Sequence, residues 1–310
     1  MSVRHRMNLA AVVCALLLIA CGAPIAAAQE TPTMEGAKAD YAAGQYQPCL
    51  MKISRLLAMP DSKKNLPQRY DLFMLRGECL LQLKSGMVAD DAFRAAATVL
   101  KDSDDTKKIA DAEATAILIK ASAGLKYQPR DKSAEPIDIV DKESRKKAMQ
   151  ALYDDRMTLF KPKVEAAIQS TNLVPIHELV PAMTDLYMLE LALTGETKQT
   201  LALGKELGSH ARDLINGALK QIGERVQDLN MIANEPSTGT LQRIGYQGLT
   251  TPQREELRNL ASELVKIEQV SIRARQMAKR MGGDPGTWEA ILANVEEIKD
   301  LAQRTYDRRY

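Results

Sequence analysis

The residues that could do acid–base or metal chemistry are few and far apart in this chain of 310 residues. The histidines are His5, His177 and His210, and none has the HExxH spacing that places two zinc ligands on one helix face. Ser144 and Lys147 have the S-x-x-K spacing of some serine nucleophiles, but the companion motifs are missing. No phosphate-binding or dinucleotide-binding loop is present. We therefore expect a protein that is not an enzyme and that uses no cofactor or metal.

One acidic segment has much of the chemistry of a calcium loop. Positions 1, 3, 5, 8 and 12 of an EF-hand loop would be Asp102, Asp104, Thr106, Ile109 and Glu113. Lys107 stands at the sixth position, where the sharp turn of such a loop needs glycine. We therefore expect a solvated loop in which Asp105 or Thr106 caps the next helix.

The N-terminus has the pattern of an export signal. A basic segment, Arg4–Arg6, precedes the uncharged apolar run Leu9–Ala20, which is too short to span a bilayer comfortably. Cleavage after Ala28 would make residues 1–28 the signal peptide. Alternatively, residues 18–21 resemble a bacterial lipobox, so that Cys21 would carry lipid and tether the chain to a membrane. Either reading predicts an exported protein of the periplasm or cell envelope, or a secreted one.

Beyond this leader only Cys49 and Cys79 remain. An oxidising compartment would permit a disulfide between them. Sequence spacing alone does not guarantee the geometry of such a bond, and two buried thiols are the alternative.

The charge balance argues against nucleic acid as a partner. The chain has 42 basic and 40 acidic residues, and removal of the leader takes away Arg4 and Arg6 alone, which leaves 40 of each. Such a neutral chain lacks the basic surface that phosphate binding needs. The basic run Arg145–Lys147 is expected to lie on the solvated face of a helix. Membrane contact is expected only through a lipid on Cys21.

The composition favours an all-α fold. Apolar residues make up 45% of the chain, but aromatic residues only 4%. A core built from Leu, Ile, Ala and Met suits helices better than sheets.

A repeated spacing appears in the first third of the chain. In residues 72–100, one helix would carry Phe73, Gly77 and Leu80, and the next Ala89, Phe93 and Ala96. This spacing resembles the tetratricopeptide repeat, a helical hairpin in which small residues let two helices approach. The segment 44–48 is echoed at 124–129, which predicts repeats of about 40 residues over 34–130. Residues 131–136 would break the second helix of the third repeat.

The resemblance implies a binding function rather than catalysis. In that family the first helix of each repeat lines a concave groove that receives a peptide or a partner helix. By position, the groove residues here would be Lys38, Tyr41, Asp71, Met74, Glu78 and Gln82.

Longer helices are expected over 137–234. The periodicity and caps predict helices over 141–156, 163–170, 182–193 and 197–233, with Pro175 and Pro181 delaying the third. A single apolar stripe on the last helix begins at Leu201 and passes through Gly204 and Gly208 to Leu229.

The region 250–310 is expected to be an antiparallel helical hairpin. A heptad seam runs from Leu257 to Met281, Gly282–Pro285 makes the reversal, and the returning seam runs from Trp288 to Ala302. The hypotheses are therefore a non-enzymatic envelope scaffold that binds a protein or peptide, or a structural lipoprotein that self-associates through these helices as a homo-oligomer.

Overall fold

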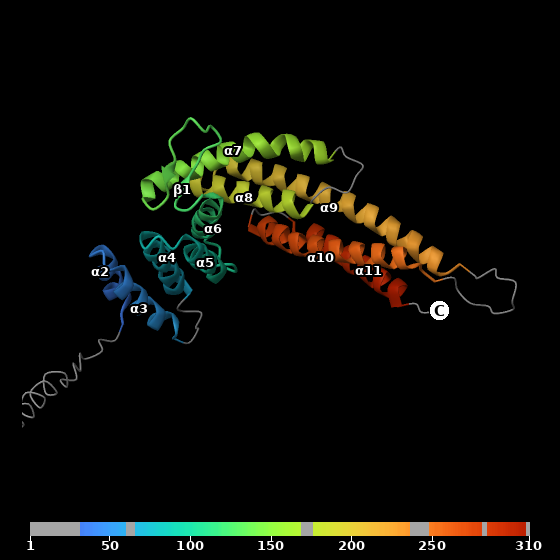
Figure 1. The fold of residues 1–310 in the computed structure, drawn as a ribbon, viewed down its shortest axis with the longest axis horizontal. Coiled ribbons are helices and arrows are strands. Elements are labelled where there is room, and N and C mark those ends of the chain that lie inside the picture. Colours follow the sequence, from blue (N-terminus) through green and yellow to red (C-terminus); the bar gives the residue numbers. More distant parts are fainter. Residues whose placement is uncertain (1–31, 60–65, 169–175, 236–247, 281–283, 308–310) are drawn as a thin grey trace, which may run out of the picture.

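The computed structural model describes residues 32–59, 66–168, 176–235, 248–280 and 284–307. It is 81% helical, and the predicted all-α fold class is confirmed. Figure 1 shows short helices stacked at one end and longer helices running side by side away from them. The predicted leader, including Cys21, and the Gly282–Gly283 part of the last reversal lie outside the described residues.

Two helical pairs begin the fold: α2 (Met34–Ala42) with α3 (Tyr46–Leu57), and α4 (Leu66–Gln82) with α5 (Gly86–Val99). Both pairs turn through a residue with a positive φ, Gly44 at 72° and Lys84 at 58°. Gly124, at 70°, follows α6 (Thr106–Ala121). These three residues are spaced at intervals of 40, so the backbone has the period that the sequence echoes predicted.

A glycine sets the close approach of α4 and α5. A Cβ atom added to Gly77 would lie 2.6 Å from Cζ of Phe93, which is fully buried. Ala89 and Ala96 of α5 are both fully buried, as the spacing predicted. Phe73 is only partly buried, at the edge of a separate cluster.

A short β-hairpin follows α6, where a third helical pair would need its second helix. The antiparallel strands are β1 (Lys126–Tyr127) and β2 (Ile137–Asp138), although the sequence predicted no strand. The fully buried Ile139 directly after β2 donates its amide to the carbonyl oxygen of Leu125 at 3.0 Å. The hairpin thus leads the chain back to the repeats before the next helix begins.

Two of the predicted helix boundaries were wrong, and a proline lies at each. The helix α7 (Lys142–Ile168) continues through Pro162, where a break was expected, and α8 (Ile176–Thr194) continues through Pro181. A proline inside a helix removes one backbone hydrogen bond. Burial of apolar side chains on both sides, such as Leu179 and Met183, offsets that loss.

The helix α9 (Lys198–Ala233) follows the prediction closely, with Thr197 accepting a hydrogen bond from the amide of Thr200 as its N-cap. Its stripe is buried at Gly204 and from Ala211 onward and partly buried at Gly208, but Leu201 is 39% exposed and does not belong to it. The heptad seam of α10 (Thr251–Arg280) and the seam of α11 (Pro285–Asp307) are buried against each other and against α9.

The cores do not follow the predicted domain boundaries. One cluster joins α7–α11. A second joins α4–α8 and includes Met277 of α10, so it links the repeat region to the long helices. Figure 1 shows α7 and α8 lying across the end of the helical stack, next to α6.

Candidate functional site

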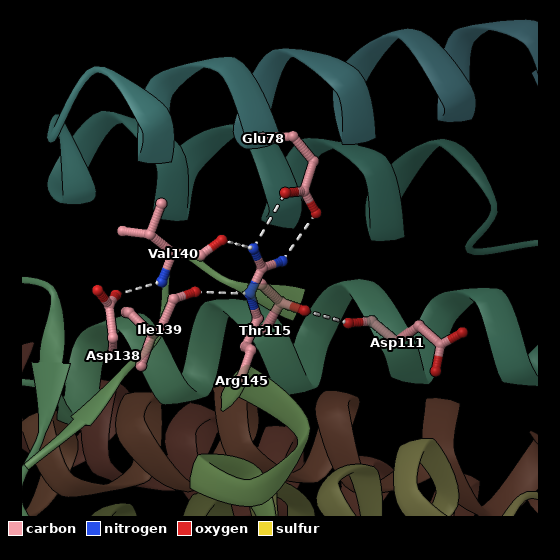
Figure 2. A network of polar contacts seen from close by, with 7 residues as sticks. All are labelled: Glu78, Asp111, Thr115, Asp138, Ile139, Val140 and Arg145. Atoms are coloured by element: carbon pink, nitrogen blue, oxygen red, sulfur yellow. Dashed lines mark hydrogen bonds and ion pairs between the residues drawn. The ribbon is translucent and has the colours of Figure 1, made fainter. Parts of the chain in front are cut away.

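A buried ion pair lies on the predicted groove face. The guanidinium of Arg145 donates to both carboxylate oxygens of Glu78, Nη1 to Oε1 at 2.7 Å and Nη2 to Oε2 at 3.0 Å. The residues are only 5% and 7% exposed. Figure 2 shows the Arg145 side chain between Glu78 and the backbone of Ile139 and Val140. The prediction that Arg145 is solvated was wrong. Glu78, predicted as a groove residue, is paired with Arg145 of the same chain.

The start of α7 explains why Arg145 points inward. The carboxylate of Asp141 accepts the amide of Ser144 at 2.8 Å and so caps the helix. Arg145 then precedes Ala148, Met149 and Leu152, which are all buried, at intervals of three, four and seven residues. It therefore lies on the apolar stripe of α7, whereas Lys146 and Lys147 are exposed.

Two backbone carbonyls complete the hydrogen bonding of the guanidinium. Nε of Arg145 donates to the Ile139 oxygen at 2.8 Å and Nη2 to the Val140 oxygen at 3.1 Å. The Asp138 carboxylate in turn accepts the Val140 amide at 2.8 Å, which fixes this turn. Arg145 thereby fastens the hairpin segment and α7 to the last turns of α4.

The remaining groove residues are more open. Tyr41 is partly buried, lies close to the Gln82 side chain, and packs edge-on against Tyr46 with ring centres 5.6 Å apart. Burial raises the pKa of Tyr41, and the nearby Glu78 charge raises it further. Met74 and Gln82 are partly exposed.

Lys38 on α2 and Asp71 on α4 carry the exposed charges of this face. The structure thus brings Tyr41 and Gln82 into contact beside Glu78. Asp71 stands seven residues before Glu78, two helical turns away along α4.

Sequence reasoning missed a carboxyl group on α6. Asp111 lies one repeat of 40 residues after Asp71, and burial raises its pKa, with Lys107 partly opposing the effect. Thr115 donates to the Asp111 backbone oxygen at 2.7 Å (Figure 2). The hydroxyl of Tyr70 donates to the Lys108 oxygen at 3.0 Å and so ties α4 to α6. The repeat interval itself was the signal that could have identified Asp111.

The two cysteines lie together beneath this face. Both are fully buried and are present as free thiols, with 3.3 Å between their sulfur atoms. Cys49 belongs to α3 and Cys79 to α4, immediately after Glu78.

The acidic segment before α6 is a helix cap, as expected. The Asp105 side chain accepts the amide of Lys108 at 3.2 Å, and Ile109 is helical and fully buried. Within the described residues, no group of three His, Cys, Asp or Glu side chains could hold a metal ion. His210 is partly exposed and lies 3.8 Å from Glu206, while the side chain of His177 is outside the described set.

No family model, no curated protein and no solved structure matches this chain. Among the described helices, none combines the length and the apolar character that a membrane crossing requires.

Proposed function

We propose that the protein is a non-enzymatic scaffold of the cell envelope that binds a peptide or a partner helix on the face of α2 and α4. The observation that supports this is the contact of Tyr41 with Gln82 at the open end of a face held in shape by a buried ion pair. A partly exposed tyrosine and amide offer both apolar area and hydrogen bonds, as interface residues commonly do.

The residues of this face fall into two groups, those that hold the helices together and those proposed to contact a partner. Glu78 and Arg145 satisfy each other and set the spacing of the helices, so they are not partner contacts. Tyr41, Met74 and Gln82 then supply the adaptable contact surface, because all three keep part of their side chains in solvent. Partner recognition is proposed to use these three, with charge selectivity from the exposed residues Lys38 and Asp71.

The binding proposal is tested by cross-linking in intact cells followed by mass spectrometry. We expect cross-links from a partner to α2 and α4, and a loss of at least ten-fold in recovered complex with Asp71→Lys. Asp213→Lys is the matched control, because Asp213 is also exposed but lies on α9. Full recovery of the complex with Asp71→Lys, or cross-links confined to α9–α11, would refute the groove.

Export is proposed on the leader sequence alone. Mass spectrometry of the protein from cells is expected to find either a diacylglyceryl group on Cys21 or a chain that begins at Gln29. An intact Met1 N-terminus on protein recovered from the cell envelope would contradict the proposal.

A second candidate function is self-association through the C-terminal helices. The heptad seam of α10 is buried against other helices of the same chain. Val265 and Ile272, seven residues apart on α10, are nevertheless 43% and 36% exposed. Light scattering is expected to show a dimer that Val265→Lys with Ile272→Lys dissociates. A monomer at the highest soluble concentration of the native chain would eliminate this candidate.

A further inference from the structure

The sulfur atoms of Cys49 and Cys79 lie close enough for a small shift to bring them within bonding distance. Their sulfur atoms are 3.3 Å apart, so they need to approach by only about 1.3 Å to reach the usual S–S bond length. Cys79 donates its S–H toward Cys49, and Cys49 donates toward the Ala37 carbonyl oxygen at 3.1 Å. The two thiols thus connect α2, α3 and α4 at one buried point.

Packing requirements alone do not account for this pairing. A buried small apolar side chain would fill either position, and Ala37 already provides one beside Cys49. Two thiols in direct contact at full burial bring together the only pair of nucleophilic sulfurs among the described residues. Such a pair supplies a covalent cross-link wherever an oxidant is present.

We propose that Cys49 and Cys79 form an intramolecular disulfide that fastens α3 to α4 when the chain folds in an oxidising compartment. The oxidant is a disulfide compound. The thiolate of one cysteine attacks that disulfide, forms a mixed disulfide and releases one thiolate. The second cysteine, deprotonated in turn, attacks the protein sulfur of the mixed disulfide and releases the second thiolate. The chain loses two protons and two electrons, and the oxidant is reduced to two thiols.

The bond forms before burial is complete. Burial raises the pKa of both thiols in the folded chain, and the thiol, unlike the thiolate, is a poor nucleophile. Exchange therefore proceeds while α3 docks on α4, or when the α2–α3 pair opens. The same burial protects the finished bond from reductants in solution.

Peptide mapping tests the proposal directly on the full chain. The protein is folded in a glutathione buffer rich in the oxidised form, denatured in acid, alkylated and digested with trypsin. Cys49 is released in residues 39–52 and Cys79 in residues 77–84, while Cys14 and Cys21 share residues 7–38. We expect peptides 39–52 and 77–84 to be joined and about 2 Da lighter than the two free peptides together. Alkylated Cys49 and Cys79 in this sample, or a bond from either to Cys14 or Cys21, would overturn the proposal.

A second measurement follows the effect of the bond on folding. The urea midpoint of α2–α5 unfolding, followed by hydrogen exchange, is expected to be lower in protein that was unfolded, reduced with dithiothreitol and refolded in the reductant than in oxidised protein. The double variant Cys49→Ala with Cys79→Ala is the control, and its urea midpoint is expected to be the same with and without the reductant. Equal midpoints for the native chain mapped as oxidised and the native chain mapped as reduced would show that the bond does not fasten α3 to α4.

Discussion

Replacing Arg145 by methionine tests whether the buried ion pair holds the long helices to the repeats. The change removes both hydrogen bonds to Glu78 and leaves its carboxylate buried without its partner. It also frees the carbonyl oxygens of Ile139 and Val140. Removing one member of a buried pair costs about 3–5 kcal/mol. Because the chain contains more than one core, we expect that loss to appear as local opening around α4 rather than as one global transition.

The thiol of Cys79, next to Glu78 and fully buried, reports such opening. In reduced protein freed of reductant, the rate at which a small reagent labels Cys79 follows the population of the open form. Because about 1.4 kcal/mol corresponds to ten-fold, Arg145→Met is expected to speed labelling by about 100-fold or more. The control Lys146→Met changes the exposed neighbour and is expected to shift the rate by about two-fold at most.

The double variant Glu78→Met with Arg145→Met separates charge from packing. Apolar replacement of both partners of a buried pair is often neutral. We therefore expect labelling of the double variant to return to within about ten-fold of the native rate. The reasoning fails if Arg145→Met labels no faster than Lys146→Met. It also fails if the double variant labels as fast as the single one, because the unpaired charge would then not be the cause.

Two further predictions concern packing and pH. Gly77→Ala is expected to lower the free energy of unfolding of the repeats by about 1–3 kcal/mol, because the added Cβ would meet Phe93. The control Gly217→Ala meets nothing within 4 Å and is expected to stabilise α9 by up to about 1 kcal/mol. Hydrogen exchange measures both effects, and equal effects of the two variants would contradict the close approach of α4 and α5. Asp111→Asn is expected to stabilise the protein at pH 7, because burial raises the pKa of the folded Asp111 and the charged form carries a penalty above it. That gain is expected to vanish below about pH 4, where the carboxyl is protonated in both the folded and the unfolded state. Urea titrations of the native chain and the variant at pH 7 and below pH 4 measure the gain. The same difference in free energy of unfolding at both pH values would refute the prediction.

Local periodicity was sufficient to predict much of the fold. The seam residues Leu257, Leu264 and Ile267 of α10 are buried as the heptads required, and Trp288 is buried on the facing helix. The echoed residues Gly44 and Gly124 share one backbone conformation, with φ at 72° and 70°. In each case a residue's own neighbours in sequence determine the face or the turn that it occupies.

The boundaries at Pro162 and Pro181 could not be predicted in the same way. Proline lowers helix propensity wherever it stands, but burial of the surrounding side chains is set by helices distant in sequence. Tertiary packing therefore overrode the local preference in α7 and α8.

In the candidate site, too, residues set by local position could be named from the sequence, whereas a contact between distant segments could not. Tyr41, Met74 and Gln82 followed from helical position within a repeat. Arg145 did not, because its partner Glu78 is 67 residues earlier. Its spacing from Ala148 and Leu152 was a usable signal, since it places the guanidinium on the apolar stripe, but a run of three basic residues favours solvent more strongly.

The distance of 67 residues between Glu78 and Arg145 also imposes an order on synthesis. A chain delivered from its N-terminus presents α2–α6 before the first turn of α7, and N-terminal regions ordinarily fold first. Until residue 145 arrives, the face of α4 holds a carboxylate whose burial is unfavourable without its partner. The repeats therefore complete their folding only after the beginning of the next region has arrived.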